Sequence, residues 1–231
     1  MRASEAPICE LSRVPVVRLM PAAVLQPRLR LVDGDHVITG NAFSLDAMRE
    51  HDDYPREDIR PNPIMQGRIL QAFDYSKKQN NRFNADGSPF GVYYAGTTLA
   101  VCIEEIRWHL ANQSDPAFDR TRTYRTITAR ASGRYLDLRK TRGPALDPDI
   151  SVGYPAGQAI AAAMHGRVDG IIYPSARHSE GTNIAIFEPE RLTDFKLGQL
   201  LAFEREQKDW GYRPVVPAHL AARGMENGHV R

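Results

Sequence analysis

The stretch of residues 81–110 constrains the fold more than any other part of the chain. It is typical of a turn, a short strand, a second turn and a helix. Turn-forming residues at 84–89 favour the first bend, and the aromatic, β-prone run at 91–95 favours a buried strand. A threonine at 97 or 98 can cap the following helix. The apolar residues of that helix recur at helical spacing, which predicts a core-facing side made of Leu99, Ile103, Ile106 and Leu110.

The rest of the chain alternates short strands with helices. Strands are expected at 14–19, 121–131, 133–139, 171–173 and 184–187, and helices at 64–78 and 157–165. The proline in the first of these strands indicates an edge position, and the turn at Tyr154-Pro155 indicates where the last helix begins. A charged, proline-broken loop is expected at 51–63, apolar packing segments after about 191, and a frayed tail over the last dozen residues. This order predicts an α/β or α+β fold with mixed small sheets and flanking helices.

Composition excludes several classes of function. Of the 231 residues, 42% are hydrophobic and 25% are charged, which is ordinary for a soluble globular protein. The net charge of +2 and the lack of a basic run with aromatics argue against direct nucleic-acid binding. No apolar run is long enough to cross a bilayer, the first residues lack a secretory signal, and the two cysteines have no metal-ligand spacing. We therefore expect a cytoplasmic protein without a membrane segment or a metal.

The stretch 81–110 contains polar residues within its predicted strand and helix. A second stretch at 169–187 has a related composition, with an apolar strand followed by a polar turn. Neither stretch contains a P-loop, a dinucleotide-binding glycine motif, or the serine-hydrolase or zinc-protease motif. Arg82-Phe-Asn, then Gly-Val-Tyr-Tyr-Ala-Gly, then Cys-Ile-Glu-Glu-Ile-Arg-Trp-His, and finally the whole second stretch form an ordered set. This set resembles the RES domain, which is named for its arginine, glutamate and serine, and the resemblance covers roughly residues 80–190.

The resemblance implies a fold, an activity and a partner. RES domains are the toxin half of bacterial toxin–antitoxin pairs whose antitoxin has an Xre-like helix-turn-helix. They resemble ADP-ribosyltransferases in fold and consume NAD by hydrolysis, phosphorolysis or transfer of ADP-ribose to a protein. The implied layout is an N-terminal extension packing on the core over 1–79, a RES core over 80–190, and a C-terminal extension and tail over 191–231.

Site residues carry over position by position. The family's arginine corresponds to Arg82, and its tyrosine corresponds best to Tyr94, with Tyr93 as the alternative. The family's glutamate stands four residues before a helical histidine, which matches Glu105, whereas Glu104 would break that spacing. The family's serine corresponds to Ser175.

These residue types suit the cleavage of the nicotinamide–ribose bond of NAD, which passes through an oxocarbenium-like state. A carboxylate at Glu105 would stabilise the developing positive charge. The guanidinium of Arg82 would bind phosphate oxygens, and the ring of Tyr94 would hold the pyridinium by stacking and cation–π attraction. Ser175 has no base beside it in the sequence, so we interpret it as an orienting group. Glu105, Arg82 and Ser175 are thus the catalytic candidates, and Arg82, Tyr94 and Ser175 the NAD-binding ones.

Alternatives remain open at this point. Arg82 can be a surface ion-pair partner, Glu105 a solvated helix charge and Ser175 a turn residue, while Arg177 and His178 either contact phosphate or lie in a solvated loop. The acceptor of ADP-ribose is water, phosphate or a protein, and the long N-terminal region favours a protein. The competing function is a catalytically inactive module that binds NAD or the cognate Xre-like antitoxin.

Overall fold

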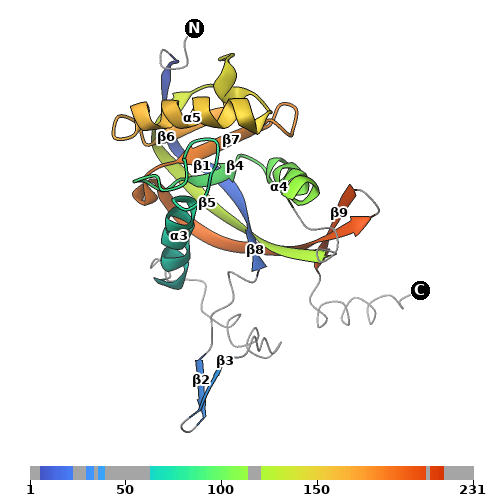
Figure 1. Cartoon of the computed structure of the whole chain (residues 1–231). Helices are drawn as coiled ribbons and strands as arrows, with labels where there is room; N and C mark the ends of the chain where they lie inside the picture. Colours follow the sequence, from blue (N-terminus) through green and yellow to red (C-terminus); the bar gives the residue numbers. More distant parts are fainter. Residues whose placement is uncertain are drawn as a thin grey trace, which may run out of the picture.

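The computed structural model describes residues 6–22, 30–33, 36–39, 63–113, 121–206 and 209–215, and its fold belongs to the predicted mixed α+β class (Figure 1). The strands are β1 (Ile8–Pro21), β2 (Arg30–Asp33), β3 (His36–Thr39), β4 (Tyr93–Gly96), β5 (Thr121–Asp137), β6 (Gly170–Pro174), β7 (Thr182–Ile186), β8 (Leu192–Glu206) and β9 (Asp209–Val215). The helices are α3 (Pro63–Ser76), α4 (Leu99–Gln113) and α5 (Ile150–Met164), with 3-10 turns η2 (Pro144–Leu146) and η3 (Pro189–Arg191). The predicted loop ahead of α3 and the predicted C-terminal tail lie outside the described residues.

The main sheet has seven strands in the order β1-β4-β7-β6-β5-β8-β9, and β1 pairs with β5 as well as with β4. Strands β1, β4, β7, β6 and β5 therefore form a closed ring, in which only the β5–β6 pairing is parallel. The prediction of an edge strand at 14–19 was wrong. Pro15 follows a register shift between Leu11 and Val14, where the ladder is already interrupted and a missing amide proton is tolerated.

Strand β5 corrects a second prediction, because the two strands expected at 121–131 and 133–139 are one continuous strand. Gly133 has a φ of 122°, which favours glycine, and it lets the strand bend without ending. The carboxylate of Asp169 accepts a hydrogen bond from the Arg134 amide at 2.7 Å, and a Cβ at Gly133 would overlap that carboxylate. The segment after 191, expected only to pack, forms strands β8 and β9.

Helix α5 begins at Ile150, well before the predicted start at residue 157. The side chain of Asp149 accepts a hydrogen bond from the Ser151 amide at 2.9 Å and so caps the first turn. Pro155 lies inside the helix and costs it one backbone hydrogen bond. This early start matters for the site, since the buried residues Gly153 and Gly157 lie against Arg82.

Each long helix covers its own cluster of buried side chains. The α3 residues Ile69 and Phe73 pack on Tyr93, and the α5 residues Ala161 and Met164 belong to a second cluster. Helix α4 buries Cys102, Ile103 and Leu110 against side chains of β8 and β9 and also contacts β1 and β4. Thr98 is its cap, because its hydroxyl accepts a hydrogen bond from the Val101 amide. The strand predicted at 91–95 and the helices predicted after 98 and at 64–78 are thereby confirmed.

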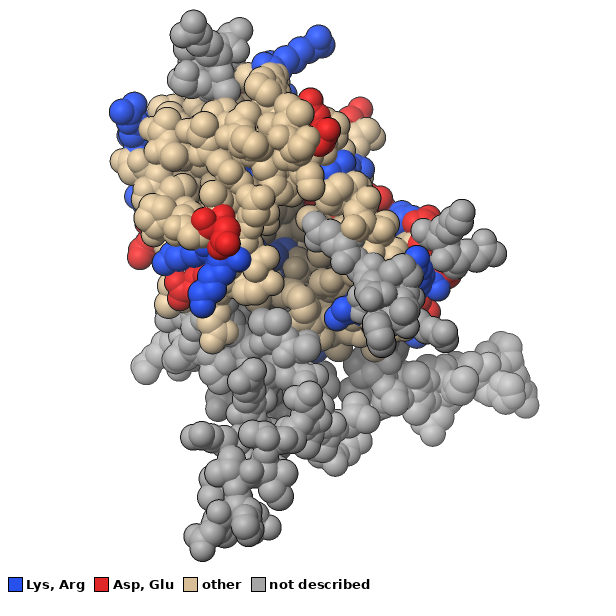
Figure 2. Space-filling model, in the orientation of Figure 1, with Lys and Arg blue, Asp and Glu red and all other residues tan. Residues whose placement is uncertain are grey.

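The three predicted segments of the chain share one sheet. Strand β1 comes from the predicted N-terminal extension, and β8 and β9 from the predicted C-terminal extension. The boundaries at 79 and 190 stay predictions. Within the described ranges, no helix combines the length and apolarity needed to span a membrane. On the face shown in Figure 2, acidic and basic side chains are interspersed and form no large patch of one sign.

Candidate active site

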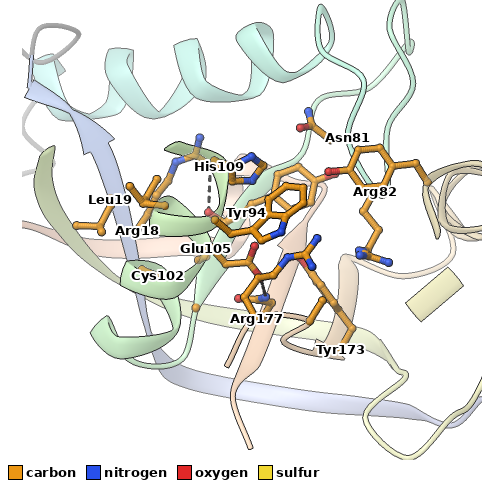
Figure 3. A pocket seen from close by; sticks show the side chains of 17 residues that line it. Arg18, Leu19, Asn81, Arg82, Tyr94, Cys102, Glu105, His109, Tyr173 and Arg177 are labelled. Atoms are coloured by element: carbon orange, nitrogen blue, oxygen red, sulfur yellow. Dashed lines mark hydrogen bonds between the residues drawn. The ribbon is translucent and has the colours of Figure 1, made fainter. Parts of the chain in front are cut away.

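A solvent-open cavity of about 240 Å³ lies where β1, β4, α4, α5 and the β6–β7 region meet (Figure 3). Its polar and aromatic lining comes from segments far apart in the sequence, so the fold is what brings these side chains together. These lining residues are Arg18, Asn81, Arg82, Tyr94, Glu105, Trp108, His109, Tyr154, Tyr173, Arg177 and Asn183.

Glu105 is the carboxylate of this cavity. Its Oε1 accepts a hydrogen bond from Asn183 Nδ2 at 3.0 Å and one from Ser175 Oγ at 3.3 Å. The neighbouring Glu104 lies outside the lining and forms an ion pair with Arg107 at 3.1 Å. Helical geometry separates the two glutamates, because consecutive residues on a helix point about 100° apart. Glu105, Cys102 and His109 share the cavity flank of α4.

Ser175, directly after β6, contacts the site through Glu105 and is not itself part of the cavity lining. Its hydroxyl oxygen accepts hydrogen bonds from the amides of Arg177 at 3.2 Å and His178 at 3.1 Å. Because these amides supply protons to the oxygen, the hydroxyl proton is free to be donated to the Glu105 carboxylate. The arrangement fixes one oxygen of Glu105 from two sides.

Arg82 lies in the turn before β4 and is only 9% exposed. Its Nη1 donates to the backbone oxygens of Ala145 at 2.7 Å and Asp147 at 2.9 Å. Its guanidinium carbon lies 5.7 Å from the ring centroid of Tyr154, which also lines the cavity. Arg82 thus joins the 145–147 turn to the site and is part of the cavity lining.

Tyr93 and Tyr94 point to opposite sides of β4. Tyr93 is 1% exposed and stacks on Phe73 with ring centroids 5.8 Å apart. Tyr94 lines the cavity, and its hydroxyl donates to Asn84 Oδ1 at 2.8 Å while accepting from the Phe83 amide at 3.0 Å. Burial raises the pKa of the Tyr94 phenol. The hydroxyl is therefore used within the protein, and the aromatic ring is what Tyr94 offers to a ligand.

The charged lining is mostly cationic. It contains three guanidiniums, Arg18, Arg82 and Arg177, and a single carboxylate, Glu105. Among the residues that the structure describes, none of the three arginines has a carboxylate within 4.0 Å. Charges withdrawn from water are ordinarily paired. The cavity therefore suits an anionic ligand that presents a positively charged centre to Glu105.

Sequence reasoning missed several residues of this site, among them Arg18 and Asn183. Arg18 of β1 donates from Nη1 to the Tyr94 backbone oxygen at 3.1 Å, and its Nε is buried without a hydrogen-bond partner among the described atoms. Asn183 of β7 is 6% exposed and binds Glu105. Arg18 is the one charged residue in the apolar run 14–21, and Asn183 stands just ahead of the apolar residues 184–187. A polar residue at such a place in a strand is the signal that would have pointed to both.

The described part of the chain contains no group of three or more His, Cys, Asp and Glu side chains arranged to hold a metal ion. Cys102 lies on the cavity with its thiol donating to the Val17 backbone oxygen at 3.0 Å, and burial raises its pKa to about 11. Both cysteines are free.

Fold and cavity together define an α+β protein whose site surrounds one fixed carboxylate with arginines and aromatic rings. A family model of the RES domain matches residues 63–206, more than half of the chain, and the chain belongs to the RES domain family. This family is related to toxin–antitoxin systems, acts on NAD and typically pairs with an antitoxin. A search of curated proteins gave no match.

Proposed function

We propose that this chain is the toxin of a toxin–antitoxin pair, a cytoplasmic enzyme that cleaves the nicotinamide–ribose bond of NAD and transfers ADP-ribose to an acceptor. The observation that carries the proposal is the fixed carboxylate of Glu105 in a cavity whose other charged side chains are arginines. NAD matches this pattern, since its diphosphate is anionic and its nicotinamide–ribose end is cationic.

Glu105 is the proposed catalytic group. Loss of nicotinamide leaves positive charge on the ribose ring, and a carboxylate held beside that carbon stabilises the charge only as it develops. Asn183 and Ser175 fix one carboxylate oxygen in advance, so little reorganisation is needed in the transition state. Ser175 acts through Glu105 as an orienting residue.

Arg82 and Tyr94 are the proposed NAD-binding residues. The part of the Arg82 guanidinium not used by the Ala145 and Asp147 oxygens would bind a phosphate oxygen. The ring of Tyr94 would pack against the nicotinamide. The cavity is smaller than the ~300–1,000 Å³ of sites that enclose drug-sized ligands, so it would enclose the nicotinamide–ribose end and leave the adenosine end near its mouth.

The acceptor and the partner extend the proposal beyond the site. The candidate acceptors of ADP-ribose are water, phosphate and a protein side chain, and the proposed partner is an Xre-like antitoxin. Product analysis with and without phosphate, together with intact-mass spectrometry of lysate proteins, separates the three acceptors. Loss of cellular NAD on expression without the antitoxin, and its recovery on co-expression, tests the toxin role.

The central experiment compares Glu105→Gln with Glu104→Gln by nicotinamide release from NAD. Removing one preorganised electrostatic group costs about 10²- to 10³-fold in turnover, so we expect at least a 100-fold loss for Glu105→Gln. Glu104→Gln removes only a partly exposed ion pair and should stay within about twofold of the original protein. Equal activity of the two variants would remove Glu105 from its role. NAD binding without any turnover would favour the inactive binding module.

A further inference from the structure

Arg177, in the loop between β6 and β7, is fixed from two sides. Its guanidinium carbon lies 3.7 Å from the ring centroid of Trp108 on α4. Its Nη2 donates to the backbone oxygen of Pro148, just ahead of α5, at 3.1 Å. A flexible side chain is therefore held over an aromatic ring at the cavity, with little rotational freedom left to lose on binding a ligand.

The positive charge of Arg177 has no ion-pair partner among the described residues. Burial lowers its pKa, Glu105 opposes that effect and Arg82 adds to it, so the three groups influence one another across the cavity. A guanidinium remains protonated in proteins. Arg82 and Arg177, two of the three arginines of the lining, therefore repel each other, and Glu105 is the carboxylate of the same lining.

Arg82 alone is poorly equipped to bind two phosphates, because its Nη1 is already shared between two backbone oxygens. Figure 3 shows the side chains of Arg82 and Arg177 extending into the same space from different segments, with Glu105 beside them. A diphosphate presents two adjacent anionic groups, and charge-assisted bonds from a rigid guanidinium fork fit such oxygens.

We propose that Arg177 binds the diphosphate of NAD together with Arg82, and that Trp108 is a positioning residue that holds the Arg177 guanidinium in place. This inference rests on the proposed function, because it assumes that NAD is the ligand. It assigns a binding role to a loop residue, whereas Glu105, oriented by Ser175, is the residue proposed to act where the bond breaks.

The test uses the full chain and two probes, ADP-ribose, which carries the diphosphate, and nicotinamide, which does not. Calorimetry should show ADP-ribose affinity falling about 10- to 100-fold in Arg177→Ala, as expected for charge-assisted bonds, with nicotinamide affinity unchanged. The KM for NAD should rise by a similar factor, with a smaller change in kcat. Arg177→Lys should not restore binding, because an ammonium lacks the planar fork and the stacking surface.

Trp108→Ala should weaken ADP-ribose binding by a smaller factor, and adding it to Arg177→Ala should cause little further loss, since the two residues act as a unit. Arg167→Ala, an exposed arginine outside this cavity, is the matched control and should bind as the original protein does. Arg177→Gln is a second variant in case Arg177→Ala fails to fold, which circular dichroism would reveal.

Unchanged ADP-ribose affinity in folded Arg177→Ala or Arg177→Gln overturns the inference, as does an equal loss in Arg167→Ala. If NAD turnover depends on Glu105 while the KM does not depend on Arg177, the proposed function stands and this inference fails. If the original protein neither turns over NAD nor binds ADP-ribose, both fail.

Discussion

Gly157 of helix α5 lies directly against the backbone of Arg82. A Cβ at this position would overlap the carbonyl oxygen of Arg82 and lie 3.1 Å from its Cγ. A carbonyl oxygen cannot rotate away as a side-chain end can, so Gly157→Ala must displace either the helix or the turn that carries Arg82. The same displacement would strain the bonds from Arg82 to the 145–147 turn.

Two opposing terms set the expected size of this effect. Alanine is favoured over glycine inside a helix by ~1 kcal/mol. Overpacking a well-filled site costs about 1–3 kcal/mol, and weakening the buried hydrogen bond from Arg82 to the Ala145 oxygen adds ~1 kcal/mol. The net result is a loss of about 1–3 kcal/mol in the free energy of unfolding. For a chain of this length each kcal/mol shifts the Tm by about 2–4 °C, so the Tm should fall by roughly 2–12 °C.

Thermal and urea unfolding of Gly157→Ala measures this balance. The matched control is Ala162→Gly on the exposed side of the same helix, which reports the helix-propensity term alone and should lose ~1 kcal/mol. A Gly157→Ala protein that is more stable than the original by the amount the control loses would refute the packing argument. NAD turnover of the variant then shows whether the position of Arg82 matters for activity.

Two further predictions concern side chains that border the cavity. Tyr94→Phe removes the hydroxyl that bonds Asn84 and the Phe83 amide, so urea unfolding should show that the free energy of unfolding falls by about 1–3 kcal/mol. The KM for NAD should stay within a few-fold of the original value, because the aromatic ring remains. A variant of unchanged stability would contradict this prediction. Burial raises the pKa of the Cys102 thiol from 9.0 to about 11, so the unfolded chain loses this proton at a lower pH than the folded one. Stability contributed by the thiol should therefore be present below pH 9 and be lost as the pH rises towards 11. Between pH 8 and pH 10, the free energy of unfolding measured in urea should fall less for Cys102→Ala than for the original protein. An equal fall in both proteins would argue against this prediction.

The sequence predicted which residue of a neighbouring pair lies at the site where that choice depends on a single strand or helix. The correspondence with the family favoured Tyr94 over Tyr93, and the spacing to the helical histidine favoured Glu105 over Glu104. Strand alternation and helical geometry explain why the two residues of each pair point in different directions. The structure places Tyr94 and Glu105 on the cavity. Their roles in binding and catalysis stay predictions.

The sequence pattern predicted the wrong strand arrangement where a residue or strand distant in the sequence determines the local structure. Gly133 reads as the start of a new strand, but its contact with Asp169 keeps β5 continuous. Pro15 indicated an edge strand, whereas β1 pairs with both β4 and β5 and so closes the ring of strands. Arg18 contributes to the site only because that closure brings β1 beside Tyr94. The early start of α5 is different, since the Asp149 cap was a local signal that was overlooked.

The closed ring of strands has a consequence for synthesis on the ribosome. Arg18 is translated first, its neighbours on β5 follow more than a hundred residues later, and Asn183 comes after both. Contacts between such distant segments make folding slow, and domains generally fold as units. A nascent chain therefore holds no complete cavity until Asn183 has been translated, and any chemistry at Glu105 has to wait for that point.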